Sequence, residues 1–166
     1  MASAAQQLVA HLETHLPDFL AYWRQHMKIA DDDKYIDHVE QNGLAVFELV
    51  KEALLRSLSS ETVERLANKI AKERAEMNVG IGALVYNVNL GRRLVINHAL
   101  AAPLSVDELS PLIDHLNELF DQFLFHVITK YNELKEKELH EKKRAHCQIA
   151  SRPADAARTN VIEFCP

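Results

Sequence analysis

The chain has 166 residues, of which 48% are hydrophobic and 26% are charged, a length that suits one domain with a proper core and is short for two. Only 4 Gly and 5 Pro leave too little turn chemistry for a β-sandwich or barrel, so the composition favours an all-α fold. The formal net charge of -5 argues against nonspecific binding to the phosphate backbone of nucleic acids.

The first part of the chain predicts three helices with short breaks between them. Leucines at helical spacing over residues 8–16 stop at Pro17, and proline is tolerated better in the first turn of a helix than in its middle. We therefore expect one helix to end there and a second, over 17–27, to begin. The acidic run 31–33 predicts a solvated loop and the N-cap region of a third helix over 36–54.

Two further helices are predicted to follow almost without a break. Ser59 and Ser60 before Glu61 are cap candidates for a helix over 61–74. The next helix, over 77–101, is apolar on more than one side. Glycine weakens an isolated helix by about 1 kcal/mol relative to alanine, so we expect the glycines of this segment to mark a close backbone approach or a local kink. These glycines are Gly80, Gly82 and Gly91.

The last predicted helix carries the clearest periodic signal. Pro103 ends the preceding segment, and Ser105 with Glu108 forms an S-x-x-E capping box. Apolar residues recur at helical spacing over 109–131, and over 119–128 they surround the helix almost completely. One face can pack on the domain while another needs a cover, so we predict a homodimer that pairs through this helix. Its predicted seam consists of Leu116, Leu119, Phe120, Phe123 and Val127.

The composition changes abruptly after Tyr131. The charged run 132–146 predicts that the helix continues into solvent as an exit stalk, and the proline-interrupted stretch after it lacks periodicity. We accordingly divide the chain into a folded domain over 1–138 and a charged stalk with a loosely ordered tail over 139–166.

Two cysteines, Cys147 and Cys165, have neither a CxxC nor a metal-ligand spacing, so we expect no disulfide framework and no zinc site. The first residues lack the basic start and apolar run of an export signal. No segment reaches the roughly 18 uncharged apolar residues that a membrane span requires. These observations predict a cytoplasmic protein without a membrane span.

Sequence motifs of catalysis and metal binding are missing. Of nine histidines only His11 and His15 share the i, i+4 spacing of ligands on one helix face, and no acidic or Cys pair completes a metal site. The sequence contains no GxSxG, Walker loop, GxGxxG or HExxH motif, so we predict that the protein is not an enzyme. His140 with Glu141 lacks the remainder of a phosphoacceptor box and is interpreted as a stalk residue.

One polar cluster interrupts the apolar helix over 77–101. Amides or guanidinium groups at the rim of an apolar pocket hold a carboxylate or a halide, because an unpaired buried charge is costly. In the alternative, an arginine is exposed and the asparagines form hydrogen bonds between helices. The cluster consists of Tyr86, Asn87, Asn89, Arg92 and Arg93.

Three segments resemble the N-terminal sensor domain of sporulation histidine kinases of the Bacillus group, a family that includes free-standing sporulation-inhibitory sensor proteins. They are VEQNGLAVFELV, NKIAKERAEMNVGIGALVYNVNLGRR and LNELFDQFLFHVITKYNELKEK. The resemblance covers roughly residues 15–138. Its most specific part is the run 86–92 together with Phe120, Asp121, Phe123 and Tyr131.

This resemblance implies a globin-like sensor domain over 1–138 without haem. It also implies a fatty acid in the space that haem would occupy and a nearby chloride or other halide. The implied homodimer is built from the last two long helices of each copy, which form a four-helix interface. If the helices over 36–54, 61–74, 77–101 and 105–131 correspond to globin helices B, E, G and H, only about Glu76 to Asn78 separates E from G. No room is left for the helix that carries the proximal histidine.

With the resemblance, further residues are assigned to the ligand pocket between the three helices over 36–101. These residues are Phe47, Val50, Val63, Leu66, Ile70 and Arg74. A kinase would continue into a phosphoacceptor helix and an ATP-binding domain. We therefore expect an excised sensor, a truncated product or a free-standing regulator.

Two main hypotheses follow. In the first, a fatty acid or similar apolar ligand shifts the packing at the dimer interface and so regulates sporulation-type histidine kinase signalling and its phosphorelay. In the second, a ligand-free interaction module uses the same helix to titrate a kinase or anti-sigma partner. A third hypothesis, a haem-binding oxygen sensor, requires the proximal helix for which the spacing leaves no room.

Overall fold

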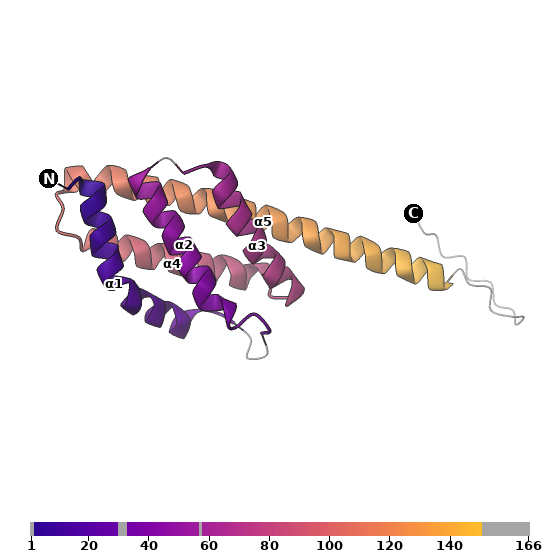
Figure 1. The fold of residues 1–166 in the computed structure, drawn as a ribbon. Coiled ribbons are helices and arrows are strands. Elements are labelled where there is room, and N and C mark those ends of the chain that lie inside the picture. The colour runs from indigo at the N-terminus through magenta and orange to yellow at the C-terminus, as the bar shows by residue number, and fades with distance from the viewer. Residues whose placement is uncertain (1, 30–32, 57, 151–166) are drawn as a thin grey trace, which may run out of the picture.

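The computed structural model describes residues 2–29, 33–56 and 58–150, and these form helices and turns with no strand (Figure 1). The helices are α1 (Ala4–His26), α2 (His38–Leu55), α3 (Ser60–Glu76), α4 (Ile81–Leu100) and α5 (Val106–Ala150). The all-α class predicted from composition is therefore confirmed. In the described part of the chain, no helix has the length and apolar character needed to cross a membrane.

The predicted break at Pro17 is wrong, because α1 is a single helix with this proline inside it. Figure 1 shows that α1 changes direction along its length, as helices do at an internal proline. Both halves are anchored in the core: Leu12 before the proline and Phe19 after it are buried. We infer that this burial offsets the roughly 3 kcal/mol that a proline costs in a helix interior.

The predicted caps of two helices are present. The Ser59 hydroxyl accepts a 3.3 Å hydrogen bond from the Thr62 backbone N–H at the start of α3. At the start of α5, the Ser105 backbone N–H donates to Glu108 Oε2 at 3.0 Å, and the Glu108 N–H returns a bond to the Ser105 hydroxyl at 3.4 Å. These bonds satisfy backbone donors that a helix start leaves free, which is why the sequence signal was reliable.

The turn between α3 and α4 is short, as predicted, but α4 begins at Ile81 and not at the predicted residue 77. Asn78 adopts a left-handed φ of 53°, and the Val79 N–H donates to the Arg74 carbonyl at 3.1 Å, the bond that closes a helix in a Schellman motif. Helix α5 holds this turn in place. The Tyr131 hydroxyl donates to the Val79 carbonyl at 2.7 Å, and Lys135 Nζ donates to Asn78 Oδ1 at 2.6 Å.

The five helices share one core, in which α3 packs along α5 and α1 packs against both α2 and α4. All five residues of the predicted dimer seam belong to this core, and none is more than 6% exposed: Leu116, Leu119, Phe120, Phe123 and Val127. Their side chains are covered by the chain's own helices, so they offer a partner no surface. The exposed apolar side chains of α5 lie elsewhere, and among them Phe125, at 65% exposed, is beside the predicted seam.

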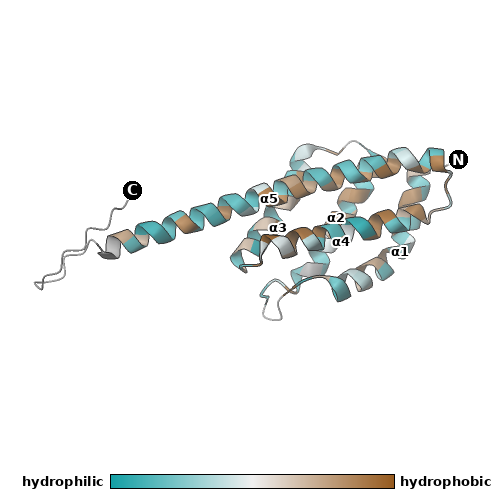
Figure 2. Ribbon diagram, turned by 180° about the vertical axis from the view of Figure 1, so that it is seen from behind, coloured by the Kyte–Doolittle hydropathy of each residue, from teal (hydrophilic) through white to brown (hydrophobic). Residues whose placement is uncertain are grey.

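Helix α5 continues beyond the bundle, and Figure 2 shows mostly hydrophilic residues along this extension. Glu138 pairs with Lys135 at 3.0 Å and with Lys142 at 2.6 Å. The hydrogen bonds from Lys142 and Lys135 lower the pKa of Glu138 to about 2. The helix includes the predicted stalk through Ala150, whereas residues 151–166 of the predicted tail lie outside the described residues.

Candidate functional site

A cavity of about 70 Å³ lies inside the bundle and is lined by residues of all five helices. Its wall is mainly apolar, and among the described residues that line it the polar ones are Asn42, Arg74 and Asn87. Ligand sites in proteins commonly combine an apolar wall with a few convergent polar groups. This cavity is therefore the candidate site.

The second half of α1 covers one side of the cavity. Phe19, Trp23 and Met27 follow one another at i, i+4 spacing and all line the cavity. The indole of Trp23 stacks on Phe19 with ring centres 6.5 Å apart and donates from Nε1 to the Asn87 carbonyl at 3.3 Å. Because this indole is one wall, its position sets how much space the cavity offers.

Gly43 of α2 makes room for Trp23. A Cβ added at Gly43 would lie 2.6 Å from Cζ3 of the indole, a distance that requires the ring to move. The prediction that glycines mark close approach applies only weakly to Gly91, where a Cβ would lie 3.9 Å from Trp23 Nε1. It is not met at Gly80 and Gly82, which have no such neighbour within 4 Å.

Substituting Gly43→Ala is expected to lower the free energy of unfolding by about 1–3 kcal/mol, because the rigid indole that would lie 2.6 Å from the new Cβ must shift. Urea unfolding followed by circular dichroism measures this loss. Gly82→Ala is the matched control, since Gly82 is an exposed position of α4 with open space around it. That variant should gain up to about 1 kcal/mol from helix propensity, and equal effects of the two substitutions would contradict the packing argument.

Asn87 joins the end of α1 to α4. Its Oδ1 accepts from the Lys28 backbone N–H at 2.7 Å, and its Nδ2 donates to the Lys28 carbonyl at 2.9 Å. Both bonds involve a buried side chain, so they satisfy polar groups that would otherwise be costly to bury. The sequence left open whether the asparagines bind a ligand or form hydrogen bonds within the protein. Asn87 forms such hydrogen bonds.

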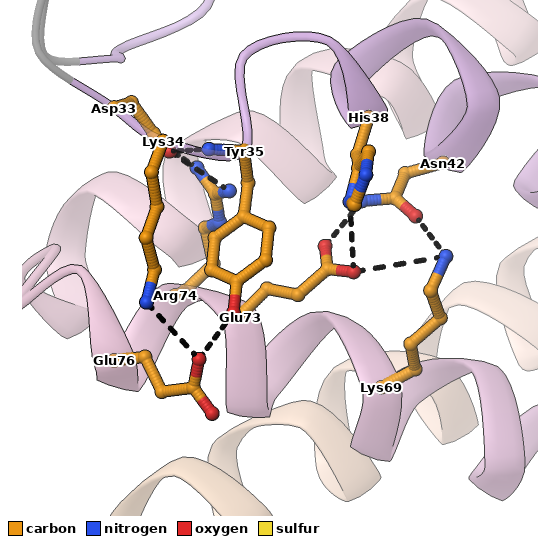
Figure 3. Close-up of polar contacts among 9 residues, drawn as sticks. All are labelled: Asp33, Lys34, Tyr35, His38, Asn42, Lys69, Glu73, Arg74 and Glu76. Atoms are coloured by element: carbon orange, nitrogen blue, oxygen red, sulfur yellow. Dashed lines mark hydrogen bonds and ion pairs between the residues drawn. The ribbon is translucent and has the colours of Figure 1, made fainter.

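Arg74 of α3 forms a buried ion pair with Asp33, which lies in the segment before α2 (Figure 3). The side chain of Arg74 is 8% exposed and that of Asp33 is 0% exposed. Arg74 Nη1 pairs with Asp33 Oδ2, and Nη2 donates to Oδ1 at 3.4 Å. The prediction of a solvated loop over 31–33 is therefore wrong for Asp33, because Arg74 stabilises its charge inside the protein.

A second buried acid, Glu73, lies beside this pair (Figure 3). Its Oε2 accepts from Asn42 Nδ2 at 2.8 Å, and Asn42 Oδ1 accepts from Lys69 Nζ at 2.9 Å. His38 Nδ1 lies 3.5 Å from Glu73 Oε1. Sequence reasoning missed Asn42 and Glu73, although Glu73 stands three residues after the apolar stripe position Ile70 and so shares its helix face.

The structure brings only part of the predicted ligand set to the cavity. Ile70, Arg74 and Asn87 line it. The apolar members that pack into the wider core are Phe47, Val50, Val63 and Leu66. Tyr86, Asn89 and Arg93 are exposed. Arg92 donates to Asn117 Oδ1 at 2.7 Å and pairs with Asp121 at 2.7 Å, so it joins α4 to α5.

The size and chemistry of the cavity limit what it holds. Cavities of about 150 Å³ accept one benzene-sized molecule, so a cavity of about 70 Å³ must widen to accept an alkyl chain. No histidine is among the described residues that line it. Arg74 is the charged residue among them, and its guanidinium is paired with Asp33.

Three histidines gather where α1 meets α4. The rings of His11 and His15 have centres 4.6 Å apart, and His15 stacks on His98 at 5.3 Å. His11 Nε2 lies 3.0 Å from the His98 carbonyl oxygen. Within the described part of the chain, no three His, Cys, Asp or Glu side chains are placed to hold a metal ion.

The histidine cluster predicts a loss of stability on acidification. Desolvation, followed by the charges of His15 and His11, lowers the pKa of His98 below 6.5, while Asp18 opposes this shift. Between the lowered value and about 6.5 the unfolded chain binds more protons, so stability falls as the pH drops through this window. Urea unfolding at pH 7.5, 6.5 and 5.5 should show a shallower decline for His98→Asn than for the unmodified protein. An equal decline in both proteins would contradict this assignment.

Comparisons of this chain with known proteins find a matching family and related proteins. The family model described as "Histidine kinase N terminal" matches residues 5–133. A Bacillus anthracis relative, named uncharacterized protein pXO2-61, is 23% identical over 128 residues, which cover 77% of this chain and 94% of that protein. The crystal structure of the sporulation inhibitor pXO2-61 from Bacillus anthracis matches with a TM-score of 0.72 at 23% identity, over 77% of this chain and 97% of that one.

Proposed function

The chain belongs to the histidine kinase N-terminal family, and from this membership we propose that it is a signal-sensing domain of sporulation-type signalling. In this proposal a fatty acid or similar ligand enters the central cavity and changes how the domain regulates a histidine kinase or phosphorelay partner. The description of pXO2-61 as a sporulation inhibitor supports a regulatory role of the same kind. The resemblance predicted from three sequence segments is confirmed by the family match.

The observation that carries the proposal is an apolar cavity with a single guanidinium in its wall. The second half of α1 covers this cavity, and α1 also packs on α2 and α4. A ligand that widens the cavity on this side displaces α1 relative to its neighbours. Such a displacement transmits a signal only if the ligand binds the two arrangements with different affinities.

The proposed homodimer uses a surface other than the predicted seam. Phe125 is exposed on α5, and its neighbours Leu124 and Ile128 are half-buried. Aromatic residues are enriched in the cores of protein interfaces, and this supports a contact at Phe125. The predicted halide has no assigned place in this proposal, because Arg92 is engaged by Asn117 and Asp121.

The second candidate function is a ligand-free interaction module that titrates a kinase or anti-sigma partner. The small volume of the cavity, about 70 Å³, favours this alternative, since no alkyl chain enters without rearrangement. In that case the same exposed face of α5 would contact the partner, and the cavity would be a packing defect.

A direct test uses Trp23, the only tryptophan of the chain, which lines the cavity. Titration with decanoic acid should change its fluorescence in a saturable manner, because a ligand in the cavity touches or displaces the indole. Mass spectrometry of the denatured purified protein should in parallel release a bound lipid. If no lipid is released and no saturable change occurs, the ligand-free module is the better description.

A further inference from the structure

Arg74 lines the cavity and is paired with Asp33, which is not among the lining residues. Arg74 is the only charged side chain among the described residues that line the cavity. Its guanidinium is already paired with a carboxylate from within the chain, and that carboxylate is fully buried. The ring of Tyr35 lies 5.8 Å from Arg74 Cζ and covers the pair.

Asp33 does not lie on a helix. It belongs to the segment that leads into α2. Asp33 Oδ1 accepts from the Tyr35 backbone N–H at 2.8 Å, and the Tyr35 hydroxyl donates to Glu76 on α3. The Asp33 side chain can therefore be withdrawn without breaking a helix.

We propose that Asp33 is an internal stand-in for a ligand carboxylate, and that an acidic alkyl ligand binds by replacing Asp33 on the guanidinium of Arg74. This inference rests on the proposed function, and it names the head-group anchor and the competitor that the ligand displaces. The apolar tail then lies against the wall formed by Ile70 and Phe120, which line the same cavity.

The exchange keeps every charge paired or solvated. Arg74 passes from one carboxylate to another, so no unpaired guanidinium is left inside the protein, and Asp33 becomes hydrated. A neutral ligand of equal length provides no such replacement. The pair therefore selects for acids over alcohols.

The exchange also changes the start of α2. When Asp33 leaves Arg74, the bond from the Tyr35 N–H to Asp33 Oδ1 is no longer held in place by the ion pair. A ligand in the cavity thereby weakens a backbone hydrogen bond in the segment that leads into α2.

The test measures binding of decanoic acid and of decan-1-ol, which has the same chain length and no carboxylate, to the full chain and to two variants. Asp33→Asn removes the competing charge and should bind decanoic acid about tenfold or more tightly than the unmodified protein, with unchanged affinity for decan-1-ol. Glu40→Gln is the matched control: it removes an exposed acid of α2 that pairs with Arg24 and does not line the cavity, and it should bind both probes as the unmodified protein does.

A second measurement in the unmodified protein is independent of the folding of Asp33→Asn. Amide hydrogen exchange at Tyr35 should become faster with decanoic acid than with decan-1-ol. Equal affinity of Asp33→Asn and the unmodified protein for decanoic acid, or equal exchange with the two probes, would overturn the inference and leave the proposed function standing. If neither probe binds any of the three proteins, the proposed function fails and the inference fails with it.

Discussion

Arg74→Met is expected to lower the free energy of unfolding by about 3–5 kcal/mol, the usual cost of removing one partner of a buried ion pair. The Asp33 carboxylate has no exposed surface, so it would be left inside the protein without a counter-charge. Methionine preserves much of the apolar length of the arginine stem, which limits the loss of packing. The expected loss therefore reports mainly on the uncompensated charge.

Urea unfolding at neutral pH measures this effect, and Arg24→Met is the matched control. Arg24 pairs with Glu40 at the surface, where the two side chains are 56% and 47% exposed, so its loss should cost no more than about 1 kcal/mol. The double variant Asp33→Leu/Arg74→Met should recover part of the loss, because it removes both charges. A cost for Arg74→Met as small as that for Arg24→Met would show that the pair is hydrated in solution.

Phe123→Glu and Phe125→Glu are expected to differ in their effect on folding, although the two residues lie only two positions apart on α5. Phe123 is 3% exposed, and its replacement deletes a core ring, at about 3–5 kcal/mol, and buries a carboxylate without a partner. Domains of this size have a total stability of only about 5–15 kcal/mol. Phe123→Glu should therefore unfold the chain rather than merely separate two copies.

Phe125→Glu should leave the fold intact, because this ring is largely in solvent. If the exposed face of α5 is the dimer contact, the variant sediments as a folded monomer while the unmodified protein sediments as a dimer. Circular dichroism separates this result from unfolding. A folded Phe123→Glu, or a Phe125→Glu that stays dimeric, would contradict the assignment of the two faces.

The helix caps illustrate which features could be predicted from sequence. Ser59 and the Ser105–Glu108 box act through hydrogen bonds to residues three positions away, so their effect is local and readable in one dimension. The short α3–α4 connection was predicted in the same way from the spacing of two apolar segments. By contrast, the continuity of α1 through Pro17 depends on burial against distant helices, and no local pattern contains that information.

The candidate site was predictable only in part, and for the same reason. Arg74 and Ile70 were found because they lie on the face of an apolar stripe. Trp23 and Gly43 were not assigned to the site, since their contact joins residues of different helices that are remote in the chain. Asp33 was assigned to solvent because an acidic run is usually hydrated, and only the position of Arg74 across the fold makes its burial favourable.

The sequence by itself determined the all-α class, the caps at the starts of α3 and α5 and the family, because helical periodicity, caps and motif residues act over a few positions. Only the tertiary structure decided which sides of α5 are core and which are surface. Phe123 and Phe125 are equally apolar, yet packing of α5 against the other helices buries one and exposes the other. A helix that is apolar all round carries no signal for this choice, which depends on where its neighbours lie.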